Sequence, residues 1–274
     1  MANVRGLWVR LALLVSLLVP VWFLVAALGT RFGLFDWRVG FGLMTFKLSG
    51  PILLGALGFA LIGLILALIV PPRAGRRLAL IAVLIPALGL GYGLTAASAA
   101  KKIAPIHDIT TDLADPPAFS AAVIAARAKV PGGNGVDLAS AKLPDDPRFG
   151  PLAGKPVVDV QRAAYGDIKP LLTDSAAFDA FQVALDTAQA QKGWVVDRND
   201  SASGMIEAHA TSFWYGFTDD IVIRVRALPD DSGTMIDMRS TSRVGLSDLG
   251  MNARRVRAYM QALNTNLGEA ATGG

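Results

Sequence analysis

Apolar residues are distributed so unevenly that they divide the chain at about residue 100. Before that point lie three nearly uninterrupted apolar runs, at 7–28, 51–70 and 78–97. Each run is about 20 residues long, and at ~1.5 Å per residue such a helix spans the ~30 Å hydrocarbon core of a bilayer. The pattern therefore predicts three transmembrane helices.

Prolines and glycines within these runs predict that the helices pack together. Pro20 and Pro86 each free a backbone carbonyl, which in lipid has to be satisfied by a neighbouring helix. Small residues allow the close approach that such packing requires. The second and third runs contain the glycines Gly55, Gly58, Gly63, Gly89, Gly91 and Gly93.

Two features of the N-terminal region leave alternatives open. A cleaved signal peptide is the alternative for the first run, although its apolar stretch is longer than usual and two more runs follow.

Orientation is also open, because five basic residues fall on either side of the predicted spans. The dense loop PPRAGRR favours the cytoplasm for that loop, and the segment 30–50, rich in aromatic residues, resembles an interfacial segment. We therefore expect the C-terminal part outside the cytoplasm.

Beyond residue 100 the pattern changes to a strap and a folded domain. Residues 101–155 form an extended strap or linker, broken by proline and glycine, with a short helix at 121–129. From 156 to 274 the periodicity predicts a helix at 175–191 with Asp174 or Ser175 as its N-cap, strands at 194–197, 204–212, 219–227 and 234–242, and a helix at 252–267. With residues 1–100 as a membrane domain, the expected fold is α+β. Its antiparallel sheet has three or four strands, and two helices lie on one face.

Alternation within the strands places charged residues on the sheet face opposite the helices. Successive side chains of a strand point to opposite faces, so the apolar set of Ile221, Ile223 and Val225 leaves its neighbours on the other side. That face can be a solvated surface with cross-strand ion pairs, or a groove whose arginines bind an anionic ligand. It comprises Glu207, His209, Asp220, Arg224, Arg226, Asp237, Arg239 and Arg243.

Composition and motifs exclude several kinds of site. The chain has no cysteine, which removes disulfides, thiolate metal sites and cysteine nucleophiles. Its net charge of +4 is scattered and partly juxtamembrane, so we expect no nucleic-acid partner. Asp219 and Asp220 are expected to diverge on their strand, and no metal-binding or phosphate-binding motif occurs, so we expect no metal and no cofactor. His107 and Asp108 with Ser240 or Ser242 form a catalytic alternative, although no nucleophile-elbow sequence accompanies them.

Three blocks of sequence resemble the Domain of Unknown Function 1499 family. They are HDITTDLADPPAF, GMIEAHATSFWYGFTDDIVIRV and DMRSTSRVGLSDLGMNARRVRAYMQAL, in that order, within about residues 103–267. The resemblance implies no established activity, but it nominates positions. Among these the ligand-binding candidates are His107, Asp108, Asp220, Arg224, Asp237, Arg239, Arg243, Asp248 and Asn252, and the other nominated residues are Asp112, Asp219, Ser240, Ser242 and Arg255.

Some nominated residues also have structural explanations. Asp248 is suited to cap the last helix, and Asn252 to hold the preceding turn. Arg239 and Arg243 are suited to pair with Asp220 or with aspartates of the strap, which would dock the strap on the sheet.

The functional expectation is a non-catalytic protein of the bacterial inner membrane with a periplasmic domain. That domain is expected to bind a polar or anionic envelope lipid or other ligand, or a protein partner, near the lipid bilayer. One alternative is an envelope hydrolase that uses His107 or His209 with nearby acids, and another is a structural membrane oligomer.

Overall fold

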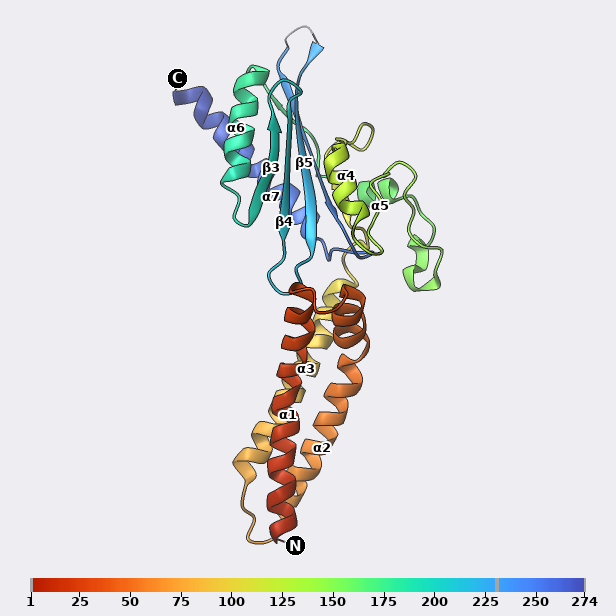
Figure 1. Ribbon diagram of the computed structural model, residues 1–274, viewed down its shortest axis with the longest axis vertical. Coiled ribbons are helices and arrows are strands. Elements are labelled where there is room, and N and C mark those ends of the chain that lie inside the picture. The colour runs from red at the N-terminus through yellow and green to blue at the C-terminus, as the bar shows by residue number, and fades with distance from the viewer. Residues whose placement is uncertain (1, 230–231, 274) are drawn as a thin grey trace. The chain divides into compact units, whose positions relative to one another are not determined.

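Apolar helices and a mixed α+β segment form separate units of the chain (Figure 1). The computed structural model describes residues 2–229 and 232–273, so the outermost residues of the predicted domains, 1 and 274, lie outside the described residues. The first unit extends to Lys102 and includes Phe213–Gly216, and the second contains Ile103–Ser212 and the chain from Phe217 onward.

The first unit contains the helices α1 (Ala2–Arg31), α2 (Ser49–Ile69) and α3 (Arg76–Ala100). In the part of the chain that the structure describes, these three helices are long and apolar enough to cross a membrane. This confirms the three predicted apolar helices. The segment between α1 and α2 contains a π-helix, η1 (Arg38–Lys47).

A hydrogen bond between helices replaces the one that Pro86 removes. The carbonyl of Ala82, four residues before Pro86, accepts a 2.7 Å hydrogen bond from the Ser16 hydroxyl of α1. Fewer glycines than expected lie where two helices pack closely. A Cβ at Gly89 would lie 2.6 Å from the side chain of Leu53, and one at Gly63 would lie 3.3 Å from Ala12. The other four glycines have no atom within 4 Å of such a Cβ. The prediction of close helix packing is therefore wrong for Gly55, Gly58, Gly91 and Gly93.

The second unit is built on a six-stranded antiparallel sheet. The strand order is β1-β6-β5-β4-β3, and β2 also pairs with β6. The bounds are β1 (Asp108–Thr110), β2 (Leu171–Thr173), β3 (Trp194–Asp200), β4 (Met205–Thr211), β5 (Thr218–Ala227) and β6 (Thr234–Ser242). The predicted α+β class is confirmed. The two unpredicted strands, β1 and β2, have only three residues each, too few to show a periodicity.

Helices lie on both sides of this sheet. Figure 1 shows α6 (Ala177–Gln189) and α7 (Met251–Gly273) on one side and α4 (Ala121–Ala128) on the other. The remaining helical elements are a 3-10 segment, η2 (Pro147–Leu152), and α5 (Val157–Ala164). The N-cap prediction for α6 is wrong, because the cap is Ala176, which has no side-chain oxygen to accept a backbone hydrogen bond.

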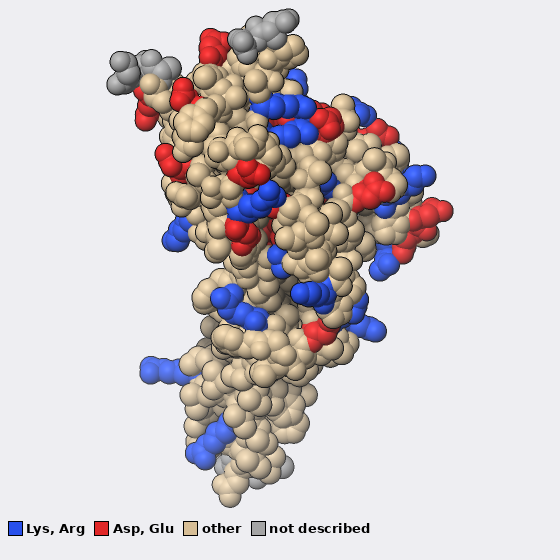
Figure 2. Space-filling view, turned by 45° about the horizontal axis from the view of Figure 1, so that its top comes forward, with Lys and Arg blue, Asp and Glu red and all other residues tan. Residues whose placement is uncertain are grey.

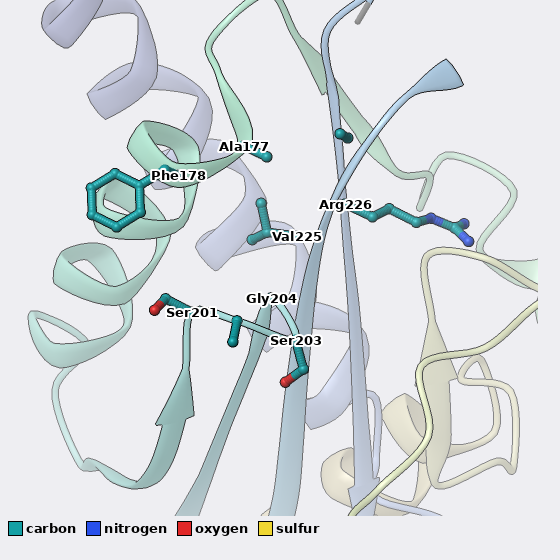
Figure 3. A pocket seen from close by; sticks show the side chains of 9 residues that line it. Ala177, Phe178, Ser201, Ser203, Gly204, Val225 and Arg226 are labelled. Atoms are coloured by element: carbon teal, nitrogen blue, oxygen red, sulfur yellow. The ribbon is translucent and has the colours of Figure 1, made fainter. Parts of the chain in front are cut away.

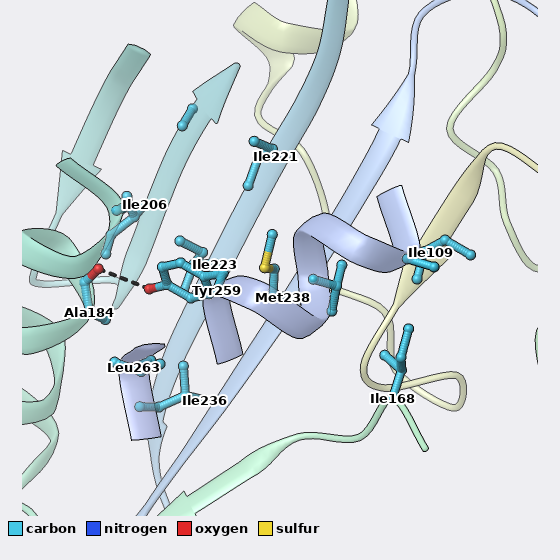
Figure 4. Packing of buried hydrophobic residues seen from close by; sticks show 14 of the residues in the cluster. Ile109, Ile168, Ala184, Ile206, Ile221, Ile223, Ile236, Met238, Tyr259 and Leu263 are labelled. Atoms are coloured by element: carbon cyan, nitrogen blue, oxygen red, sulfur yellow. Dashed lines mark hydrogen bonds between the residues drawn. The ribbon is translucent and has the colours of Figure 1, made fainter. Parts of the chain in front are cut away.

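The core lies between the sheet and the pair α6 and α7 (Figure 4), and it continues to buried residues of the segment 101–155 and of α5, such as Leu138 and Val160. Ile221 and Ile223 of β5 contribute to it as the alternation predicts, and both are fully buried. Tyr259 of α7 is also fully buried, and its hydroxyl donates a 2.9 Å hydrogen bond to the carbonyl of Ala184 in α6. This bond satisfies the one polar atom of a large buried side chain, and burial raises its pKa.

Candidate functional site

The polar sheet face is buried beneath the strap, which we define as residues 101–155. Glu207, Asp220, Asp237 and Arg239 are each at most 4% exposed, so the expectation of a solvated face is wrong for these residues. Burying charged groups is costly unless they are paired and hydrogen-bonded. The strap and the neighbouring strands supply those partners.

Asp220 of β5 is the centre of the first ion-pair cluster. Its carboxylate accepts a 2.7 Å hydrogen bond from Nη1 of Arg127 in α4 and another of 2.7 Å from Nη2 of Arg243. Arg127 also donates to the carbonyls of Thr241 and Ser242. Arg127 was not predicted from the sequence, where its one signal is that it stands alone in the otherwise apolar segment AAVIAARA.

Arg239 of β6 forms the second pair with Asp108 of β1. Its Nε and Nη2 donate to the two carboxylate oxygens at 2.9 and 2.7 Å, which is the bidentate geometry that arginine favours. Nη2 also donates to the carbonyl of Val136, and the guanidinium lies 5.2 Å from the ring centre of Phe119. The strap is therefore attached to the sheet through ionic, backbone and aromatic contacts.

Two arginines and three aspartates form the third cluster. Arg224 donates to Asp237 at 2.8 Å, and Arg226 donates to Asp115 at 2.9 Å and to Asp112 at 3.2 Å. Burial raises the pKa of Asp237, and the hydrogen bond from Arg224 opposes that shift. The hydrogen bond from Arg226 lowers the pKa of Asp115. Acids of the strap and of the sheet thus share the same two cations.

Asp219 and Asp220 diverge as the alternation predicts. Asp219 accepts a 2.7 Å hydrogen bond from Arg255 of α7, whereas Asp220 pairs with the strap on the opposite face. Within the described residues no group of three or more histidine, cysteine, aspartate or glutamate side chains is arranged to hold a metal ion.

Asn252 links the start of α7 to β6 and β1. Its Oδ1 accepts a 2.6 Å hydrogen bond from Ser240, and its Nδ2 donates to the carbonyl of His107 at 2.8 Å and to Ser242 at 3.0 Å. Asn252 is fully buried, so these bonds satisfy an amide that burial would otherwise penalise. The sequence predicted only that Asn252 holds the turn before α7. In the structure Asn252 also connects that turn to β6 and to the residue before β1.

Asp248 caps α7 as predicted. Its two carboxylate oxygens accept hydrogen bonds from the backbone N–H groups of Gly250 at 2.7 Å and Asn252 at 2.6 Å. Burial raises the pKa of Asp248. Asp248 and Asn252 therefore both fix the loop between β6 and α7.

The two histidines lie on separate parts of the sheet. His107 directly precedes β1, and its Nδ1 lies 3.4 Å from the carbonyl of Leu246, where burial lowers the pKa of the imidazole. His209 of β4 lies 2.7 Å through Nδ1 from Asp197. Because β6 and β5 separate β1 from β4, the sheet does not bring the two imidazoles together.

Two shallow pockets stand out among the described residues of the α+β domain. The first, of about 310 Å³, includes Phe178 and Ser203, and its only ionisable lining residue is Arg226. Figure 3 shows the Arg226 side chain pointing away from the other labelled residues, which agrees with its pairing to Asp112 and Asp115. This pocket therefore has no charged group directed into it.

The second pocket, of about 390 Å³, is a groove beside the start of the strap. One wall is 111–114, and the other runs from Arg162 to Pro170. Lys169 has no hydrogen bond or ion pair among the described residues, and Arg162 pairs only with Asp159 at the surface. This groove was not predicted from the sequence, because Lys169 has no distinctive neighbours in the chain. Figure 2 shows acidic and basic side chains interspersed over the domain and few charges on the apolar helices.

Together, the three apolar helices and the strap-covered sheet define a class of protein in which an α+β domain follows apolar membrane-type helices. Residues 108–263 match the family model described as Protein of unknown function (DUF1499). The match covers more than half of the chain, so the chain belongs to this family, as its sequence blocks indicated. No curated protein and no solved structure matches the chain.

Proposed function

We propose that this protein is a non-catalytic, membrane-anchored binding protein that holds a polar or anionic ligand in the groove beside Lys169. The observation that carries the proposal is a groove of about 390 Å³ with an unpaired lysine in its lining. A second cation, Arg162, needs to give up only one solvent-exposed ion pair to contact a ligand. Such a surface pair contributes little to stability, so exchanging it for a ligand anion costs little.

The arginines proposed from sequence are less accessible for binding. Arg239 donates to Asp108 of the strap, and a ligand would have to displace the strap to reach it, whereas Arg243 already donates to Asp220 of β5. The pair of Arg239 and Asp108 instead holds β1, which is followed directly by the wall 111–114. Thr111 of that wall accepts a 2.9 Å hydrogen bond from the backbone of Met238 in β6. The nominated residues Asp108 and Arg239 thus help to position this wall of the groove.

The ligand proposal is tested with the full chain purified in a mild detergent. Native mass spectrometry should find a bound small anion or lipid, and Lys169→Ala should reduce its occupancy by about tenfold, the equivalent of one charge-assisted hydrogen bond. Lys155→Ala is the matched control, because it removes another exposed lysine outside the groove.

Three results would count against this proposal. Wild-type protein without any bound species would contradict ligand binding, and equal occupancy in the two variants would contradict the location. Recovery of a defined protein complex without a small ligand would favour the protein-partner alternative. The hydrolase alternative needs His107 or His209 beside an acid in a cleft. His209 pairs with Asp197, but neither pocket described above is lined by a histidine.

We also propose that the α+β domain is periplasmic and that the helices lie in a bacterial inner membrane. The support is the short arginine-rich loop between the second and third apolar helices, which favours the cytoplasm. A phosphatase fused after the last residue should be active, whereas a fluorescent protein that requires the cytoplasm should stay dark. The reverse pattern would place the domain in the cytoplasm.

A further inference from the structure

An exposed apolar loop follows the last strand of the sheet. We call residues 245–251 the leucine loop, because Leu246, Leu249 and Met251 are 53%, 49% and 48% exposed. Single exposed leucines are common on protein surfaces, but three large apolar side chains within six residues are a local concentration. The loop belongs to the family signature, and none of the roles described above uses these three side chains.

The hydrogen bonds of its backbone show that this loop is held in place. Asn134 of the strap donates to the carbonyl of Gly245 at 2.8 Å, and Asp248 accepts the Gly250 N–H at 2.7 Å. Leu249 has a φ of +54°, a left-handed conformation that residues with a branched side chain rarely adopt. The surrounding bonds hold this conformation, so the leucines are displayed on an ordered loop.

The leucine loop contacts the residues with which the second unit begins. A Cβ at Gly250 would lie 3.4 Å from the side chain of Ile103, and the Asp248 N–H donates to the carbonyl of Ile106. Ile103 follows Ala100, the last residue of α3, by three residues. At no more than ~3.6 Å per residue, this connection is shorter than about 11 Å. This bound follows from the covalent connection alone and requires no particular placement of the two units.

We propose that the leucine loop docks on the bilayer and places Leu246, Leu249 and Met251 in its interfacial region. Aliphatic side chains gain free energy when they leave water, and the short connection makes the lipid surface available without a separate binding event. The strap residue Asn134 and the helix cap Asp248 then hold a membrane-contacting loop in position. This docking is independent of any ligand in the groove.

A fluorescent label at position 249 tests the docking directly. The chain has no cysteine, so Leu249→Cys introduces a unique labelling site. The labelled full chain is reconstituted in phosphatidylcholine vesicles with and without lipids that carry a spin-label quencher in their upper acyl chains. Leu172→Cys is the matched control, because Leu172 is 63% exposed on β2 and pairs near the opposite end of β6. We expect quenching several-fold stronger at position 249 than at position 172.

Two outcomes of this experiment would overturn the proposal. Equal quenching at both positions would mean that the loop stays in water. A blue-shifted emission at position 249 that the lipid quencher does not reduce, and that depends on the protein-to-lipid ratio, would mean that a second copy covers the loop instead.

A double variant provides a second readout. Leu246→Asn with Leu249→Asn removes both leucines, and asparagine tolerates the left-handed backbone better than leucine does. In vesicles, hydrogen exchange of the loop amides should become several-fold faster, while exchange in β5 and β6 should stay unchanged. Unchanged exchange in the loop would contradict docking, and the strand amides confirm that the domain remains folded.

Discussion

Replacing Asp220 by alanine is expected to destabilise the α+β domain by about 3–5 kcal/mol, the usual cost of removing one partner from a buried ion pair. Asp220 is the shared acceptor of Arg127 and Arg243, and the side chains of Asp220 and Arg127 are only 2% and 3% exposed. Without the carboxylate, Arg127 keeps its carbonyl partners but loses its counter-charge. The strap should then separate more often from the sheet.

Hydrogen exchange of β5 and β6 amides in the full chain measures this effect, because it reports local opening free energies. Asp146→Ala is the control, since it removes an aspartate from a pair whose arginine side chain is 83% exposed, and we expect it to cost less than about 1 kcal/mol. Combining Arg127→Met with Asp220→Ala should cost less than the sum of the two single changes. Similar effects for Asp220→Ala and Asp146→Ala would show that the buried cluster does not hold the strap.

Substitutions of Arg239 are expected to separate the effect of charge from that of geometry. Arg239→Ala leaves Asp108 buried without its partner and should cost about 3–5 kcal/mol. Arg239→Lys retains a cation but not the two parallel hydrogen bonds to Asp108, so we expect an intermediate loss of about 1–3 kcal/mol. Both should make the strap more sensitive to proteolysis at Gly132 and Gly133 than the wild type.

Limited proteolysis with mass spectrometry of the fragments provides the measurement. Arg148→Ala is the control for loss of an arginine, because Arg148 makes a surface pair with Asp146. If Arg239→Lys behaves like the wild type, the bidentate geometry is unimportant. If Arg239→Ala leaves the strap as resistant as the control does, attachment depends on other contacts.

The periodicity of the sequence predicted those helices and strands that are long enough to show a repeating pattern. The continuous apolar runs correspond to α1, α2 and α3, because a membrane-spanning helix needs about 20 apolar residues whatever its neighbours are. Alternation placed Ile221 and Ile223 in the core and Asp220 on the opposite face, because the side-chain period of a strand is two. Asp248 was recognised as a cap from its position alone, since capping is a local interaction.

The sequence suggested pairing of Arg239 and Arg243 with Asp220 or with aspartates of the strap, but only the tertiary structure selected the partners. Arg127 reaches Asp220 over 93 residues, and Arg239 reaches Asp108 over 131, so no local pattern encodes either pair. The strap therefore covers a face that alternation could describe only as charged. The groove beside Lys169 is likewise formed by segments that are separate in sequence, 111–114 and 162–170. Sequence determined which side of each strand is polar, whereas packing of the strap determined whether that side meets water, because burial depends on what else the chain places there.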